Sequence, residues 1–134
     1  MDDDIRWALT STRTWAVVGL SPSAWRDSHR VASLLQRRGF RVLPVNPHCD
    51  EVLGERSYAS LRDIEEPVDV VDVFRRSSAA GAHVDEAIEI GARGVWLQLA
   101  VIDEAACARA REAGLHVVMD RCPAIELPKL AASA

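Results

Sequence analysis

Five short apolar runs, separated by segments of helical periodicity, constrain the fold of this chain more than any other feature. Each run is aliphatic and continuous, as is typical of parallel strands that are buried on both faces. Strands that alternate with helices form a parallel sheet with helices on both faces, joined by right-handed crossovers. The sequence therefore predicts a doubly wound α/β fold whose strands are Trp15–Gly19, Arg41–Val45, Val70–Phe74, Val95–Leu97 and Val117–Met119.

Capping and stop signals bound the helices between these strands. Asp27 or Ser28 is the expected cap of the first crossover helix, and Gly39 is its stop. The helix before the last strand opens at Asp103 and closes at Gly114.

The segments outside this pattern are expected to be minor. Residues 51–66 have room only for a short helix or a turn, so the crossover between the second and third strands is abbreviated. A helix runs from Asp2 to about Leu9, and the tail AIELPKLAASA is irregular. With 134 residues the chain has the length of a single domain, predicted to span 1–134 with a core at about 14–126.

Composition and charge argue against several classes of function. The N-terminus is acidic where a signal peptide is basic, and no apolar run approaches the roughly 18 residues of a membrane span. A formal net charge of −4 offers no broad basic surface for nucleic acid. The three cysteines have no C-x-x-C spacing, which fits a reducing compartment. We expect a cytoplasmic protein that binds neither nucleic acid, membrane nor a metal ion.

Polar and cationic side chains gather where the predicted strands end. Open α/β sheets bind ligands at this carboxyl edge, where the strand order reverses. The sequence therefore predicts a ligand site built from the residues after each strand. These are Gly19, Ser21, Ser23, Asn46, Pro47, Phe74, Arg75, Arg76, Gln98 and Cys122.

The turn after the first strand, GLSPSAWRDS, fits two common chemistries poorly. Dinucleotide binding uses G-x-G-x-x-G and an acidic residue about 20 residues later. Here only Gly19 fits, and the second strand ends in Asn46 and Pro47 without a carboxylate, so an NAD(P)-binding domain is a weak alternative. A nucleophilic Ser21 fails as well, because Pro22 lacks the N–H that the oxyanion hole of such a turn requires.

Phosphate binding accounts for more of the residues in this turn. Ser21, Ser23 and Ser28 offer hydroxyl donors, and the following helix directs free N–H groups toward the turn. Arg26 can pair with phosphate oxygens. The alternative is that Ser28 only caps the helix, which needs no ligand.

Four blocks of the sequence together resemble a known family. They are VVGLSPSAWRDSHRVASLLQRRGFRVLPVNP, PVDVVDVFRRS, GARGVWLQL and VVMDRCPAIE, and they extend from about Thr14 to Glu126. The chain resembles the small stand-alone CoA-binding domains, which are similar to the CoA-binding domain of succinyl-CoA synthetase α subunits. The resemblance implies a Rossmann-like five-stranded parallel sheet of order 3-2-1-4-5, with a coenzyme A site along its carboxyl edge.

The resemblance also implies roles for individual residues. By this resemblance the phosphates would contact Gly19, Ser21, Arg26 and Ser28. The turn would be flanked by Asn46 and Pro47. The nucleotide end of the ligand would be bordered by Phe74, Arg75 and Arg76. Ser21 departs from the synthetase pattern, which has a second glycine there. Coenzyme A carries about four negative charges. A protein of net charge −4 therefore needs arginines concentrated at one edge to hold it.

No catalytic centre is evident in the sequence, which predicts a binding module for coenzyme A or an acyl-CoA. Gln98 can reach a pantetheine amide from the end of the fourth strand. Cys122 leaves open an alternative, a small enzyme or redox protein that acts on a CoA thiol or thioester. Arg121 favours a thiolate at Cys122 and Asp120 opposes it. The sequence therefore leaves open both a binding module and a protein that reacts through Cys122. A partner enzyme and a homo-oligomer are both compatible with the sequence.

Overall fold

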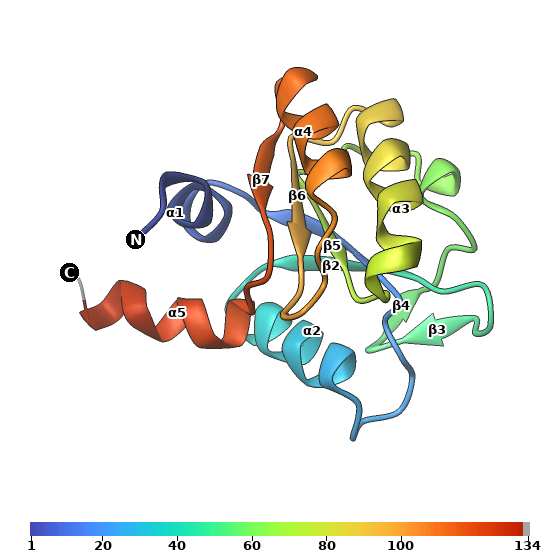
Figure 1. Ribbon diagram of the computed structural model, residues 1–134. Coiled ribbons are helices and arrows are strands. Elements are labelled where there is room, and N and C mark those ends of the chain that lie inside the picture. Colours follow the sequence, from blue (N-terminus) through green and yellow to red (C-terminus); the bar gives the residue numbers. More distant parts are fainter. Residues whose placement is uncertain (133–134) are drawn as a thin grey trace.

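A parallel sheet of five strands forms the centre of the computed structural model, which describes residues 1–132 (Figure 1). In chain order its strands are β1 (Thr14–Val18), β2 (Arg41–Val45), β5 (Val70–Val73), β6 (Gly94–Leu97) and β7 (His116–Val118). Five helices accompany it: α1 (Asp3–Thr10), α2 (Asp27–Arg37), α3 (Ser77–Glu89), α4 (Glu104–Glu112) and α5 (Pro123–Ala132). The predicted α/β class and all five predicted strands are confirmed. No strand boundary differs from its predicted position by more than one residue.

The spatial order of the sheet is β2-β1-β5-β6-β7, and a rudimentary strand extends it beyond β2. Tyr58 makes one parallel bridge to Val45, through bonds of 2.9 Å from its N–H to the Pro44 carbonyl and from the Asn46 N–H to its own carbonyl. With this segment as strand three, the Rossmann-like order 3-2-1-4-5 is confirmed, and β7 follows at the far edge. The run from Val70 is thus the fourth strand in that order and not the third.

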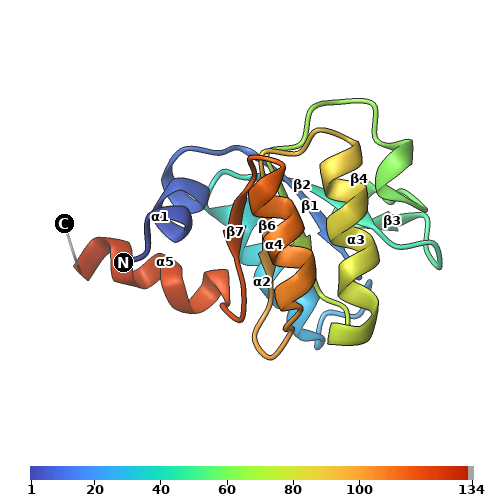
Figure 2. The same cartoon turned by 45° about the horizontal axis from the view of Figure 1, so that its top comes forward.

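Alternation along the strands divides the apolar residues between two cores. On one face Ala16 and Val18 of β1 pack with α3 and α4, and on the other Trp15 and Val17 pack with α1, α2 and α5. This is the period of two expected for a strand that is buried on both sides. Figure 2 shows α3 and α4 side by side over one face of the sheet. All five residues of β1 are buried, which places this strand at the centre of the molecule.

Two of the minor segments have more structure than the sequence indicates. The abbreviated crossover contains a hairpin of β3 (Glu51–Val52) and β4 (Glu55–Arg56), followed by a 3₁₀ helix at Leu61–Asp63. The prediction of an irregular tail is wrong for residues 124–132, which belong to α5; Ser133 and Ala134 lie outside the described residues. Leu127 of α5 is buried in the core beneath α1 and α2, and this burial outweighs the cost of Pro128 inside the helix. No helix within residues 1–132 has the length and apolar character to span a bilayer.

Candidate functional site

Three depressions meet at the carboxyl edge of the sheet. The turn cavity, of about 360 Å³, lies over the loop after β1 and is lined by residues that include Gly19, Asn46 and Phe74. The α3-side cavity, of about 340 Å³, shares Gly19 and Asn46 with it. The α2-side cleft, of about 750 Å³, shares Phe74 and Asp27 with the turn cavity and Arg75 with the α3-side cavity. Because neighbouring depressions share lining residues, the three lie next to one another at the carboxyl edge of the sheet.

Gly19 brings the loop after β1 against the loop after β5. Its φ is +83°, and a Cβ at this position would lie 2.6 Å from the Phe74 carbonyl oxygen. The Gly19 N–H donates to the Val45 carbonyl, and the Phe74 N–H donates to the Val18 carbonyl, both at 2.9 Å. Only glycine combines this backbone conformation with this approach. Gly19 therefore allows the loops after β1 and β5 to lie against each other.

The serines of the turn hold its shape through hydrogen bonds to one another. The Ser28 hydroxyl oxygen accepts the Ser21 N–H at 3.0 Å, and the Ser21 hydroxyl oxygen accepts the Ser23 N–H at 3.1 Å. The prediction that Asp27 or Ser28 caps α2 is wrong: Arg26 occupies the cap position and makes no side-chain capping bond. The first N–H groups of α2 are left without a side-chain acceptor among residues 1–132, and such groups attract anions.

Three exposed arginines surround this turn without a carboxylate partner. Arg26, Arg75 and Arg76 have no acidic group within 4.0 Å in the described part of the chain. Arg26 lies over the Trp25 ring at 4.8 Å, and the Arg76 Nε donates to the Ser78 hydroxyl at 3.1 Å. Positive charge is therefore concentrated at the carboxyl edge of a protein whose net charge is −4.

Asn46 lines both the turn cavity and the α3-side cavity, and Pro47 lines the α3-side cavity. The Asn46 amide nitrogen donates to the Leu20 carbonyl at 3.0 Å, and its amide oxygen accepts the His48 N–H at 2.9 Å. Both polar atoms of this side chain are thus engaged with the backbone. Asn46 ties the end of β2 to the first turn and thereby positions both loops.

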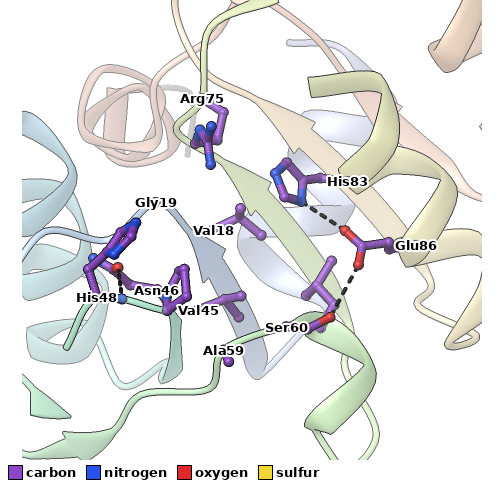
Figure 3. Close-up of a pocket in the computed structure, with 12 residues that line it drawn as sticks. Val18, Gly19, Val45, Asn46, His48, Ala59, Ser60, Arg75, His83 and Glu86 are labelled. Atoms are coloured by element: carbon purple, nitrogen blue, oxygen red, sulfur yellow. Dashed lines mark hydrogen bonds and ion pairs between the residues drawn. The ribbon is translucent and has the colours of Figure 1, made fainter. Parts of the chain in front are cut away.

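The α3-side cavity has an apolar floor and a polar rim (Figure 3). Val18 and Val45 form part of the floor, and His48 and Arg75 approach it from the loops after β2 and β5. On the α3 wall, His83 Nδ1 lies 2.9 Å from Glu86 Oε1. Such a cavity suits a flat, weakly polar ring with donor and acceptor groups at its edge.

Sequence reasoning did not single out His83, Glu86 or Ser60 as site residues. The Ser60 hydroxyl donates to the second Glu86 oxygen at 3.2 Å, so the three side chains form one connected wall. His83 and Glu86 are three residues apart, the spacing that places two side chains together on a helix. That signal was available, but it lies inside a helix and not at the end of a strand.

Gln98 and Cys122 lie at the α2-side cleft, as their positions after β6 and β7 predict. Both are buried, with 6% and 9% of their surface exposed. Burial raises the pKa of the Cys122 thiol, although N–H groups of Ala124 and Ile125 oppose this shift. A thiol with a raised pKa holds little thiolate at neutral pH and is a weak nucleophile.

Asp72, beneath this cleft, is a fully buried carboxyl. It lies within β5, where the Gln98 Nε2 donates to its Oδ1 at 3.2 Å. Its Oδ2 has no hydrogen-bond partner among residues 1–132. Burial raises the pKa of Asp72 to about 8, so the carboxyl is largely protonated at neutral pH. An acidic residue inside the apolar run VVDVF was the available signal.

The sequence and the fold of this chain are similar to those of several known proteins. Residues 13–128 match the family model described as "CoA binding domain". The chain is 39% identical to the uncharacterized protein YneT of Bacillus subtilis over 119 residues, which cover 89% of this chain and 88% of YneT. A hypothetical protein from Pyrococcus horikoshii superposes with a TM-score of 0.92 at 40% identity, covering 98% of this chain and 92% of that one.

A more distant likeness extends to a larger enzyme. An acetyl-coenzyme A synthetase from Ca. Korarchaeum cryptofilum superposes with a TM-score of 0.71 at 22% identity. The match covers 87% of this chain but 27% of the synthetase. At this identity the likeness shows a shared fold.

Proposed function

Because the chain belongs to the CoA binding domain family, we propose that it binds coenzyme A across the carboxyl edge of its sheet. The observation that carries this proposal is the cluster of Arg26, Arg75 and Arg76, which are exposed and lack carboxylate partners within residues 1–132. In a protein of net charge −4, such a cluster favours a ligand with several phosphate groups.

The three depressions suit the three parts of this ligand. The turn cavity takes the diphosphate, where the first N–H groups of α2 and the guanidinium of Arg26 can donate to phosphate oxygens. The α3-side cavity takes the adenine ring on its apolar floor. The α2-side cleft takes the pantetheine arm, with Gln98 available to one of its amides. Arg75 lines both outer depressions and lies where the 3′-phosphate would be held.

The protein acts in this proposal as a binding module that presents or stores its ligand. The raised pKa of Cys122 argues against the alternative of a thiol enzyme, because a buried neutral thiol reacts slowly with thioesters and disulfides. NAD is disfavoured because the end of β2 at Val45 and the following Asn46 and Pro47 offer no carboxylate to the ribose hydroxyls.

Coenzyme A should bind more tightly than dephospho-CoA, and dephospho-CoA more tightly than NAD. The 3′-phosphate adds a charge-assisted contact to arginine, worth about 1.5–3 kcal/mol, or roughly ten-fold or more in affinity. Isothermal titration with the three ligands measures this order. Equal affinities for coenzyme A and NAD would contradict the proposed function, and equal affinities for coenzyme A and dephospho-CoA would remove the role of arginine at the 3′-phosphate.

Replacing the arginines of the cluster should weaken binding of coenzyme A. Arg26→Ala, and the double change Arg75→Ala with Arg76→Ala, should each cost about 1.5–3 kcal/mol of binding free energy. Arg111→Ala is the control, because Arg111 is exposed on α4, outside all three depressions. It is preferable to Arg109, which pairs with Asp85 on α3 at 3.0 Å. A loss at Arg111 as large as that at Arg26 would place the site elsewhere.

A further inference from the structure

The α2-side cleft extends well beyond the phosphate-binding turn. Its wall includes Asp27 at the start of α2 and Arg37 at the end, a span of about 15 Å along the helix axis at about 1.5 Å per residue. Its volume of about 750 Å³ is about twice the 360 Å³ of the turn cavity. The cleft is therefore an elongated groove that leads away from the turn.

The walls of this groove are largely apolar. Val31 and Leu34 of α2 line it, as do Leu99 and Val101 from the segment after β6. A pantetheine arm contains amides and a hydroxyl, which lose water on binding and need polar partners in exchange. Gln98 and the arginines that line the groove can satisfy such groups, whereas Val31, Leu34, Leu99 and Val101 offer only aliphatic surface. An apolar chain would fit this part of the groove without that cost.

One side of the groove leaves apolar surface in contact with water. Leu99 is 51% exposed, although the nearby Val101 is buried. Covering such a surface with an aliphatic ligand is favourable in proportion to the apolar area removed from water.

We propose that the aliphatic part of this groove holds the acyl chain of an acyl-CoA whose pantetheine arm lies beside Gln98, so that the preferred ligand is a medium-chain acyl-CoA thioester and not free coenzyme A. The inference rests on the proposed function. Asp27 and Phe74 line both the groove and the turn cavity, so a phosphate-containing head and an apolar tail of one ligand can occupy them together. An apolar segment of a partner protein, or a second copy of this chain, lacks the phosphate groups that the neighbouring turn and its arginines favour.

Titration with coenzyme A and with octanoyl-CoA tests the proposal on the full chain. Octanoyl-CoA should bind at least ten-fold more tightly, because each buried methylene adds favourable transfer free energy. Equal affinities would overturn the acyl proposal and leave the proposed function intact. Binding of neither ligand would contradict the proposed function itself, so the two failures are distinguishable.

Two variants locate the acyl chain. Leu99→Ser should reduce the affinity for octanoyl-CoA at least about five-fold more than it reduces the affinity for coenzyme A. Leu99 is half-exposed, so this change leaves the cores intact. Ile102→Ser is the matched control, because Ile102 is 46% exposed but does not line the groove. Equal effects of both changes on the affinity for octanoyl-CoA would overturn the proposal. Light scattering tests whether Leu99 instead lies in a dimer interface. The proposal would also be overturned if Leu99→Ser dissociated a dimer and left the affinity for octanoyl-CoA unchanged.

Discussion

Asp72→Asn should make the protein more stable than the wild type by an amount that grows as pH rises from 5 to 8. Asp72 is fully buried, its Oδ2 has no hydrogen-bond partner within residues 1–132, and burial raises its pKa to about 8. An asparagine keeps the size of the side chain and carries no charge at any of these pH values. The variant therefore avoids the cost of an ionised carboxylate inside the sheet.

The sign of this effect follows from proton binding. Unfolded Asp72 loses its proton near pH 4, whereas folded Asp72 keeps it up to about pH 8. Between these values the folded state binds more protons than the unfolded state, so the free energy of unfolding falls as pH rises. Each pH unit contributes up to about 1.4 kcal/mol, which gives a difference on the order of 3 kcal/mol between pH 5 and pH 8.

Urea unfolding at pH 5, 6.5 and 8 measures this difference. Asp63→Asn serves as the control, because Asp63 is exposed at the end of the 3₁₀ helix and its replacement removes a surface carboxylate. The gap between wild type and variant should widen with pH for Asp72 and stay nearly constant for Asp63. Parallel pH profiles for the wild type and Asp72→Asn would show that this carboxyl is not buried in its neutral form.

Gly19→Ala should destabilise the fold and disrupt the site together. The left-handed conformation costs a non-glycine residue about 1–2 kcal/mol. The new Cβ would also lie 2.6 Å from the Phe74 carbonyl oxygen, so the loops after β1 and β5 must separate, at a further cost of about 1–3 kcal/mol. The free energy of unfolding should fall by about 3 kcal/mol in all. Because both loops line the turn cavity, affinity for coenzyme A should fall more than ten-fold.

Gly39→Ala separates the two contributions. Gly39 has a φ of +92°, close to that of Gly19, but a Cβ there would meet nothing within 4 Å. This control carries the conformational cost alone and lies at the end of α2 that is remote from the turn. Chemical denaturation and titration with coenzyme A should show a smaller loss of stability and unchanged binding. Losses of stability that match for the two glycines would rule out the contact with Phe74 as a source of strain.

The strands, their burial on both faces and the sheet edge that carries the candidate site could be predicted from the sequence. Apolar runs, helical spacing and the glycine after β1 are local signals, because each depends on residues close together in the chain. The carboxyl ends of parallel strands lie at the same edge of a sheet. The predicted strands therefore placed four residues at this edge: Ser21, Arg75, Gln98 and Cys122.

Features that depend on contacts between residues far apart in the sequence could be seen only in the tertiary structure. The single bridge of Tyr58 to β2 involves too few residues to leave a periodic pattern, and α5 is a helix because Leu127 packs into a core formed by other elements. The protonated state of Asp72 depends on the strands and helices that exclude water from it. The three depressions lie next to one another because loops that follow different strands come together in space. Residues close together in the sequence do not show how near such loops lie to each other.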